Sequence, residues 1–193
     1  TRPTDGVASA LSELELLDAI EKDPSDDALR QVYGDLLAAR GDSRGEFIHL
    51  QCEAAHAKPE RRAELEKIAR QLLDRDDEKW TGRVRAAASL FDADQPRVGV
   101  TWDRGFVAGV RTTVDVLVRL ALLFDAAPLL TSLELVGREG DVDSRELPFA
   151  MLTTPLLRRL RSLTMRFASN EVIDALASAW HLEPLEHLEI DSQ

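Results

Sequence analysis

The 193-residue sequence contains one cysteine, Cys52, and lacks the apolar run of about 20 residues that a helix needs to span a bilayer. A single cysteine excludes a disulfide within the chain and suits a reducing compartment. The sequence from Thr1 onward also shows no secretory leader. We therefore expect a cytoplasmic protein.

Positive charge is scarce as well. The chain has 24 Lys and Arg against 35 Asp and Glu, which gives a formal net charge of −11. Nucleic acids and anionic membranes both recruit basic surfaces, so the composition argues against either as a partner. Hydrophobic residues make up 44% of the chain, which is enough for an ordinary core.

Apolar residues recur at helical spacing in the first part of the chain, which predicts a helical unit of four to five helices over residues 8–93. The first helix covers 11–21. Ser25 or Asp26 caps the second, and Gly41 ends it. The expected buried stripe of the second helix is Leu29, Val32, Tyr33, Leu36 and Leu37.

Two further helices follow. Ser43 and Glu46 fit a capping box at the start of the third, which turns Phe47 inward. Pro59 stands near the start of the fourth, which we expect to end in the charged run 74–78. Trp80 and a short segment then close the unit, and residues 92–96 mark the boundary. We expect the aromatic side chains to pack in the core.

The second part, residues 96–193, has a different pattern. Segments 98–102 and 106–112 predict a β-hairpin, and 114–126 predict a helix. Three phrases of the form L-x-x-L-x-L then begin at Leu130, Leu160 and Leu185, at intervals of 30 and 25 residues. Helix-like stretches at 145–152 and 169–180 separate them. This alternation is typical of a leucine-rich-repeat solenoid with a parallel sheet.

Side chains alternate along each strand, so the leucines of these phrases should form one buried spine. The expected inward residues are Leu130, Leu133, Leu135, Leu160, Leu163, Leu185 and Leu188. Residues 107–112 fit a degenerate earlier repeat with Thr112 in the last apolar slot. The sequence thus predicts an α+β protein in which the helical unit packs on a short solenoid.

The run from Asp26 to Gln51 resembles the bacterial repeat-companion domain, which precedes divergent leucine-rich repeats. Its text is approximately D-D-x-x-R-x-V-Y-A-D-W-L-x-x-x-G-D-x-R-G-E-F-I-x-L-Q. The chain departs from it at Gly34 and Leu36. A second landmark, an R-G-F hairpin, is similar to Arg104, Gly105 and Phe106. The resemblance implies this fold and adds no catalytic activity.

Polar residues in the same run suggest a structural network. Arg30, Asp35, Arg44, Glu46 and Gln51 lie close in sequence, and we expect arginine–carboxylate pairs to hold the second and third helices together. The alternative is an enzyme or metal-binding protein that uses Asp35, Glu46, His49 and Cys52. His49, Cys52 and His56 share one helix face, as zinc ligands can, but no fourth ligand is evident.

The residues between the leucines should project from the concave solenoid sheet. They are Arg111, Ser132, Glu134, Val136, Ser162, Thr164, Arg166, His187, Glu189 and Asp191. Solenoids commonly bind partners on this surface, and mixed charge suits a protein. A basic cluster at Arg158, Arg159, Arg161 and Arg166 either grips an acidic partner or is solvated.

We therefore expect a non-enzymatic protein-interaction module, an adaptor or regulator, that needs no cofactor. An inhibitory subunit that holds a partner enzyme inactive is a further alternative. A homodimer through the C-terminal strand edge is also open, because a bare strand edge invites pairing.

Overall fold

The computed structural model describes residues 12–88, 98–136, 154–166 and 182–191. Its α-helices are α1 (Glu13–Lys22), α2 (Asp27–Ala39), α3 (Arg44–His56), α4 (Pro59–Ala88) and α5 (Leu120–Ala126). Two 3-10 turns are η1 (Val114–Arg119) and η3 (Pro155–Arg159). The strands are β1 (Gly99–Asp103), β2 (Phe106–Thr113), β3 (Ser132–Val136), β4 (Ser162–Met165) and β5 (His187–Ile190).

These strands form one sheet in the order β1-β2-β3-β4-β5. β1 and β2 run antiparallel, and the remaining neighbouring pairs run parallel. The expected mixed α+β class with a mostly parallel sheet is confirmed.

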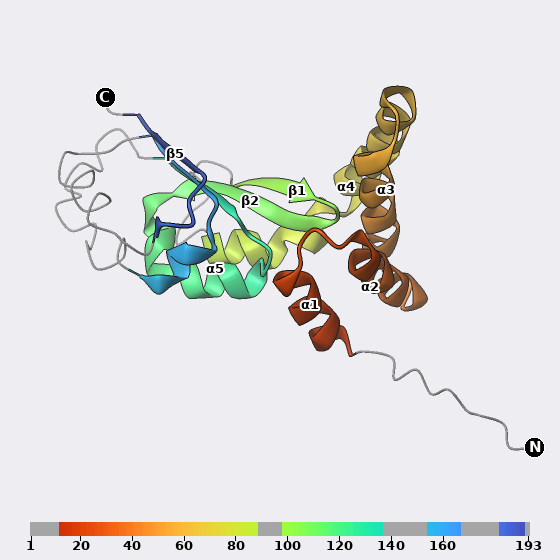
Figure 1. The fold of residues 1–193 in the computed structure, drawn as a ribbon, viewed down its shortest axis with the longest axis horizontal. Helices are drawn as coiled ribbons and strands as arrows, with labels where there is room; N and C mark the ends of the chain where they lie inside the picture. Colours follow the sequence, from red (N-terminus) through yellow and green to blue (C-terminus); the bar gives the residue numbers. More distant parts are fainter. Residues whose placement is uncertain (1–11, 89–97, 137–153, 167–181, 192–193) are drawn as a thin grey trace, which may run out of the picture.

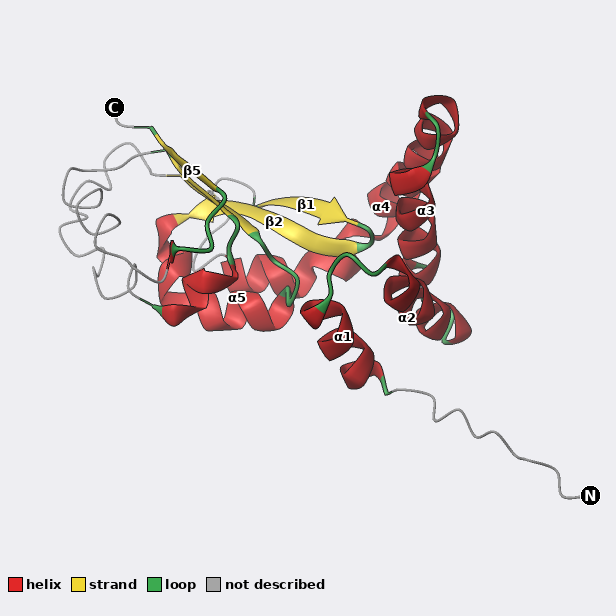
Figure 2. Ribbon diagram, in the orientation of Figure 1, coloured by secondary structure: helices red, strands yellow, loops and turns green. Residues whose placement is uncertain are grey.

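Helices cover one face of the sheet. α5 and the last turns of α4 pack there, and the opposite face, the outer face, carries no helix among the described residues (Figure 2). The helical arm, which we define as α3 with residues 59–75 of α4, projects to one side of the sheet (Figure 1). Among the described residues, the side chains on the outer face are exposed or partly exposed, and those on the other face form the core.

The first two helices begin where the sequence places caps. Ser12 and Glu15 form a capping box at α1. At α2 the Asp26 side chain accepts hydrogen bonds from the backbone N–H groups of Ala28 and Leu29, at 2.8 and 3.3 Å. These bonds satisfy donors that lack partners in the first turn, so the predicted cap is confirmed at Asp26.

The α2–α3 connection is a tight turn that requires glycine. Gly41 has a φ of +74°, and its N–H donates to Ala38 O. The N–H of Asp42 donates to Leu37 O, which completes a Schellman motif. Gly41 therefore ends α2 as predicted, because a side chain would be strained at this φ.

The capping box expected at Ser43 is wrong. Ser43 has helical backbone angles and makes no side-chain cap bond. Its hydroxyl instead donates to Asp76 on α4, at 2.6 Å. Asp42 takes the capping role, since its carboxylate accepts the N–H of Arg44 at 3.0 Å.

The fourth helix is longer than expected. α4 begins at Pro59 but continues through the charged run to Ala88, which makes 30 residues. Charged residues of this run are paired, Arg75 with Asp76 at 2.8 Å and Asp77 with Arg85 at 2.7 Å, and they do not end the helix. The part of the expected segment after Trp80 that the structure describes, residues 81–88, thus belongs to the same helix, which is about 45 Å long along its axis.

Two other local expectations are also wrong in detail. Val32 is half exposed, and Arg30 occupies the buried face of α2 in its place. The expected helix at 114–126 begins as a 3-10 turn and becomes α-helical only at Leu120.

Leucines from successive strands lie in rows beneath the sheet. Leu133 pairs with Leu163 and Leu163 with Leu188. Five of the predicted spine residues are buried, namely Leu130, Leu133, Leu135, Leu160 and Leu163, and Leu185 is partly buried. The prediction that Leu188 is buried is wrong, because its side chain is 48% exposed on the last strand of the described sheet.

Strand β2 continues these rows. Val110 stands beside Leu133 and Thr112 beside Leu135. Thr112 is buried, and its hydroxyl donates to Ala88 O on α4 at 2.8 Å. A polar residue is tolerated in an apolar row because this bond satisfies it.

Aromatic side chains join the arm to the sheet, as the expected core packing requires. Phe47 of α3 lies 5.1 Å from Trp80 of α4 and 5.3 Å, edge to face, from Trp102 of β1. Such pairs stabilise beyond the area they bury. The expected boundary at 92–96 and the helix-like stretches at 145–152 and 169–180 lie outside the described residues.

Two leucines in the same row provide a test of the spine. Leu133→Ala should lower the free energy of unfolding by about 2–5 kcal/mol, because it leaves a cavity in a closed core. Leu188→Ala should cost less than about 1 kcal/mol, since its side chain is already half in water. Urea unfolding followed by circular dichroism measures both. Equal losses would contradict the assigned burial.

Candidate interaction surface

The outer face of the sheet carries the residues that the sequence places between the leucines. The strand register aligns Arg111, Glu134, Thr164 and Glu189 in one row. A second row contains Ser132, Ser162 and His187. We call the ten residues predicted for this face the strip. All ten are exposed or partly exposed, and Arg166 and Asp191 follow the ends of β4 and β5.

Arg166 links three strands of this face. Its Nε donates to Glu134 Oε1 at 3.2 Å and its Nη1 to Glu189 Oε1 at 3.0 Å, while Asp191 Oδ2 lies 3.9 Å away. Arg111 Nε approaches Glu134 Oε1 at 3.7 Å. The hydrogen bond to Glu134 and the charge of Glu189 raise the pKa of Arg166.

The ion pairs of the strip are weak enough to be replaced by a binding partner. Each lies in contact with solvent, where an ion pair contributes about 0–1 kcal/mol. An incoming protein can therefore exchange them for its own charged groups at small cost. The surface offers both charge signs together with serine, threonine and histidine donors and acceptors.

A second polar network holds the helices to the sheet. Arg30 is 2% exposed, and its guanidinium donates to the carbonyl oxygens of Pro24 and Asp103 at 2.8 and 3.2 Å. Arg44 donates to Gly105 O at 3.2 Å, through both Nε and Nη2. Gln51 Oε1 accepts the N–H of Gly105 at 2.6 Å. Three side chains from α2 and α3 thus grip the β1–β2 turn.

Only glycine fits at position 105 of the β1–β2 turn. Its φ is +85°, and Arg104 before it has a φ of +47°, as in a two-residue hairpin turn. A Cβ on Gly105 would lie 2.1 Å from Ile48 Cγ1. The turn is therefore pressed against α3 as closely as backbone allows.

Phe106 of β2 packs against the helices next to this turn. Its ring centroid lies 5.5 Å from that of Tyr33 and 5.1 and 5.3 Å from the guanidinium carbons of Arg30 and Arg44. Burial lowers the pKa of both arginines, and Asp103 opposes this effect at Arg30. Cation–π contact and carbonyl bonds thus replace the water that these cations lose.

The predicted arginine–carboxylate network is therefore wrong in its partners. Asp35 is exposed and lies 3.0 Å from His49 Nε2, and Glu46 is also exposed. The arginines bind backbone carbonyls of a turn more than 60 residues further along the chain. Sequence spacing indicated local pairs, but the acceptors are distant in sequence.

The cysteine and histidines of the metal alternative are spread along α3. Cys52 is buried in the core between α1, α2 and Phe106. His56 Nε2 lies 2.6 Å from Asp27 Oδ2, and Asp27 Oδ1 binds Arg104 at 3.1 Å. Among the described residues, no group of three or more His, Cys, Asp and Glu side chains is arranged to hold a metal ion.

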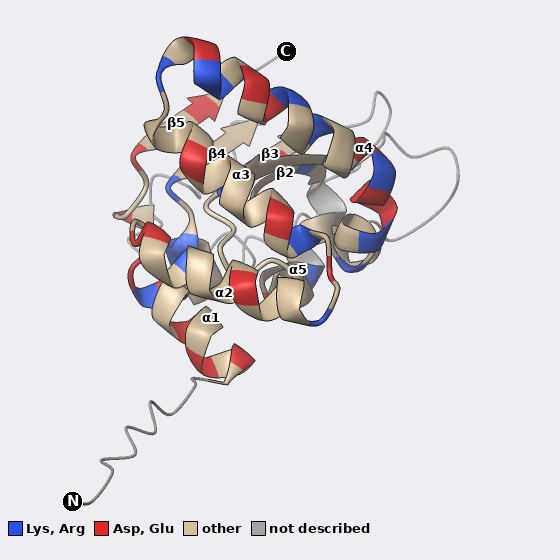
Figure 3. Ribbon diagram, turned by 90° about the vertical axis from the view of Figure 1, so that its right-hand side faces the viewer, with Lys and Arg blue, Asp and Glu red and all other residues tan. Residues whose placement is uncertain are grey.

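The arginines of the predicted basic cluster separate in space. Arg159 binds Glu21 of α1 at 2.5 Å and stacks on Phe124 at 4.7 Å. Arg161 pairs with Glu186, and Arg166 belongs to the strip. Arg158 is exposed on η3. The cluster is therefore not one basic patch, and Lys and Arg alternate with Asp and Glu over the helices (Figure 3).

The grip on the β1–β2 turn can be tested at Arg30. Arg30→Met should lower the free energy of unfolding by about 3 kcal/mol, because buried carbonyls lose their donor. Arg40→Met is the matched control: Arg40 is an exposed arginine of the α2 end that pairs with Glu13, so about 0–1 kcal/mol is expected. Denaturant titration measures the free energy of unfolding of both variants. A similar loss of stability in the two would contradict the proposed role of Arg30 at the turn.

The thiol of Cys52 gives a second test. Burial raises its pKa to about 11 from an ordinary 9.0, so about a hundredfold less thiolate is present at pH 8. A thiol reagent should therefore modify the folded protein far more slowly than the urea-unfolded chain. Fast modification without denaturant would show that Cys52 is accessible and reactive.

No helix in the described parts of the chain has both the length and the apolar character to cross a membrane. Comparison with protein-family models, curated proteins and solved structures gave no match.

Proposed function

We propose that the protein is a non-enzymatic, cytoplasmic interaction module that binds a protein partner through the strip. In this proposal residues 8–93 are a repeat-companion domain and residues 96–193 a short leucine-rich-repeat solenoid. The adaptor and inhibitory-subunit roles both use this surface.

One observation carries the proposal. The three leucine phrases form adjacent parallel strands in register. Most of their leucines lie on the face that packs against α4 and α5, and the strip lies on the face that carries no helix among the described residues. Parallel sheets normally have helices on both faces. A parallel sheet with one open face of aligned polar side chains is the arrangement that solenoids use for binding.

The chemistry of the strip supports a protein as the partner. Its charged side chains are Arg111, Glu134, Arg166, Glu189 and Asp191, so neither sign dominates strongly. A phosphate-rich or lipid partner would favour a basic face. Mixed charges instead give specificity through complementary pairing with another protein surface.

A charge reversal tests the strip while it keeps the two hydrogen-bonded pairs of Arg166. In the triple variant Glu134→Arg, Arg166→Glu, Glu189→Arg, the pairs of residue 166 with residues 134 and 189 keep opposite signs. The longer contacts with Arg111 and Asp191 become like-charged, and the pattern seen by a partner is inverted. Pull-down should recover a partner with the unmodified protein and lose it with this variant, because like charges then face each other.

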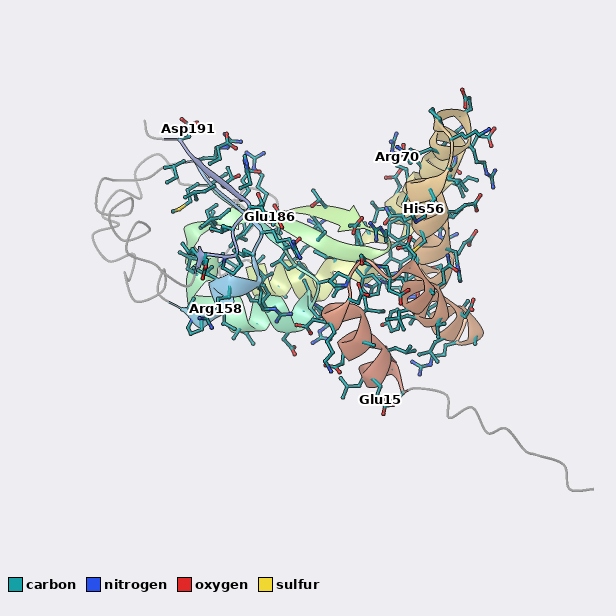
Figure 4. The ribbon with its side chains drawn as sticks, viewed as in Figure 1. Glu15, His56, Arg70, Arg158, Glu186 and Asp191 are labelled. Atoms are coloured by element: carbon teal, nitrogen blue, oxygen red, sulfur yellow. The ribbon has the colours of Figure 1, made fainter. Side chains whose placement is uncertain are left out.

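The helical arm supplies a matched control. Arg61 binds Glu53 and Glu64 there at 3.0 and 3.2 Å, so it repeats one arginine between two glutamates. The arm, marked by His56 and Arg70, lies apart from the β5 region at Glu186 and Asp191 (Figure 4). Glu53→Arg, Arg61→Glu, Glu64→Arg should leave the partner bound. Identical partner sets for both triple variants and the unmodified protein would remove the proposal.

Self-association through the edge of β5 is the second arrangement that the proposal includes. Leu188 is exposed there, and β5 pairs only with β4 within the described sheet. Sedimentation analysis of the protein and of Leu188→Lys distinguishes a homodimer at this edge from a monomer.

A further inference from the structure

A cleft of about 650 Å³ lies where the helical unit meets the sheet. Its walls come from the α1–α2 turn, the β1–β2 turn and the chain that leads into β3 and β4. The volume is within the range of ligand-binding clefts. The cleft contains no residue of the strip, so it is a separate site.

The cleft is basic although the chain is acidic. Its basic lining residues are Lys22, Arg30, Arg104, Arg159 and Arg161, and its acidic ones are Glu21, Asp23 and Asp103. Over the whole chain, by contrast, Asp and Glu exceed Lys and Arg by 35 to 24. A cleft with walls of low dielectric concentrates such a field and attracts the opposite charge.

Part of this positive charge is fixed by the fold. Arg30 is held by the carbonyl of Pro24 and the β1–β2 turn. Arg159 donates to Pro128 O and to Glu21, and it stacks on Phe124. These cations stay in place whether or not a ligand is present, so no ordering cost arises for them on binding.

Two other cations at the cleft can change partners. Lys22 is 74% exposed and pairs with Asp18 one turn earlier on α1. Arg161 is 62% exposed and pairs with Glu186, which is itself exposed. Exposed pairs of this kind contribute little, so carboxylates of a ligand can replace Asp18 and Glu186 at small cost.

The cleft also has an apolar component. Pro24 is exposed, and Ala108 and Pro128 are partly exposed, and all three line the cleft. A ligand that presents carboxylates around a small apolar group matches this combination of walls. A free inorganic anion would leave the apolar part uncovered.

We propose that this cleft binds an acidic segment of another protein, in which Asp or Glu side chains flank a small apolar residue. The carboxylates pair with Lys22 and Arg161, and the apolar side chain lies against Pro24 and Pro128. This contact is independent of the strip, and variants of the strip leave it unchanged.

The test uses a fluorescent peptide with one valine between pairs of glutamates, and a second peptide with lysines in their place. Anisotropy at low salt should show saturable binding of the glutamate peptide alone. Lys22→Gln with Arg161→Gln should weaken it about tenfold, because two exposed charge pairs are lost. Added salt should weaken it further.

The control variant is Arg61→Gln with Arg75→Gln. Both arginines are exposed on α4 and paired with carboxylates, and neither lines the cleft. Affinity should be unchanged in this control. Absence of saturable binding, equal weakening in the two double variants, or equal binding of the lysine peptide would overturn the proposal. Displacement of the peptide by millimolar phosphate or by anionic vesicles would also overturn it, because the site would then recognise simple anionic groups.

Discussion

The grip of α2 and α3 on the β1–β2 turn is the interaction on which the rest of the structure depends. Arg30, Arg44 and Gln51 bind backbone atoms of residues 103–105, and Gly105 lies directly against Ile48. Buried cations are costly unless every donor has a partner, so this contact allows one relative placement of helices and sheet. The basic cleft exists because that placement brings the α1–α2 turn beside the start of β3.

The outer face of the sheet follows from a different constraint. Alternating leucines bury one side of β3 and β4, and the register then aligns every second residue on the other side. The pairs around Arg166 connect β4 to both of its neighbours. The proposed binding surface is thus a consequence of the same periodicity that forms the core.

Much of the fold could be predicted because local patterns determine it. The cap at Asp26, the turn at Gly41 and the three leucine strands follow from residue types at fixed spacings. The length of α4 could not be predicted from the charged run alone. Asp76 of that run accepts a hydrogen bond from Ser43, and Asp77 pairs with Arg85 within the helix. Leu188 was expected to be buried but is exposed, because a strand beyond β5 would be needed to cover it and the described sheet contains none. The acceptors of Arg30 and Arg44 could not be predicted, because they lie far along the chain. The burial of Arg30 had a local signal, since a residue three positions before Tyr33 lies on the same face of α2.

The unbroken course of α4 has a mechanical consequence. Its first turns belong to the arm and its last residues, Val84, Ala87 and Ala88, to the core beneath the sheet. The two parts are joined by helical backbone and not by a loop. A displacement of the arm is therefore passed to the core beneath the sheet along one ladder of backbone hydrogen bonds.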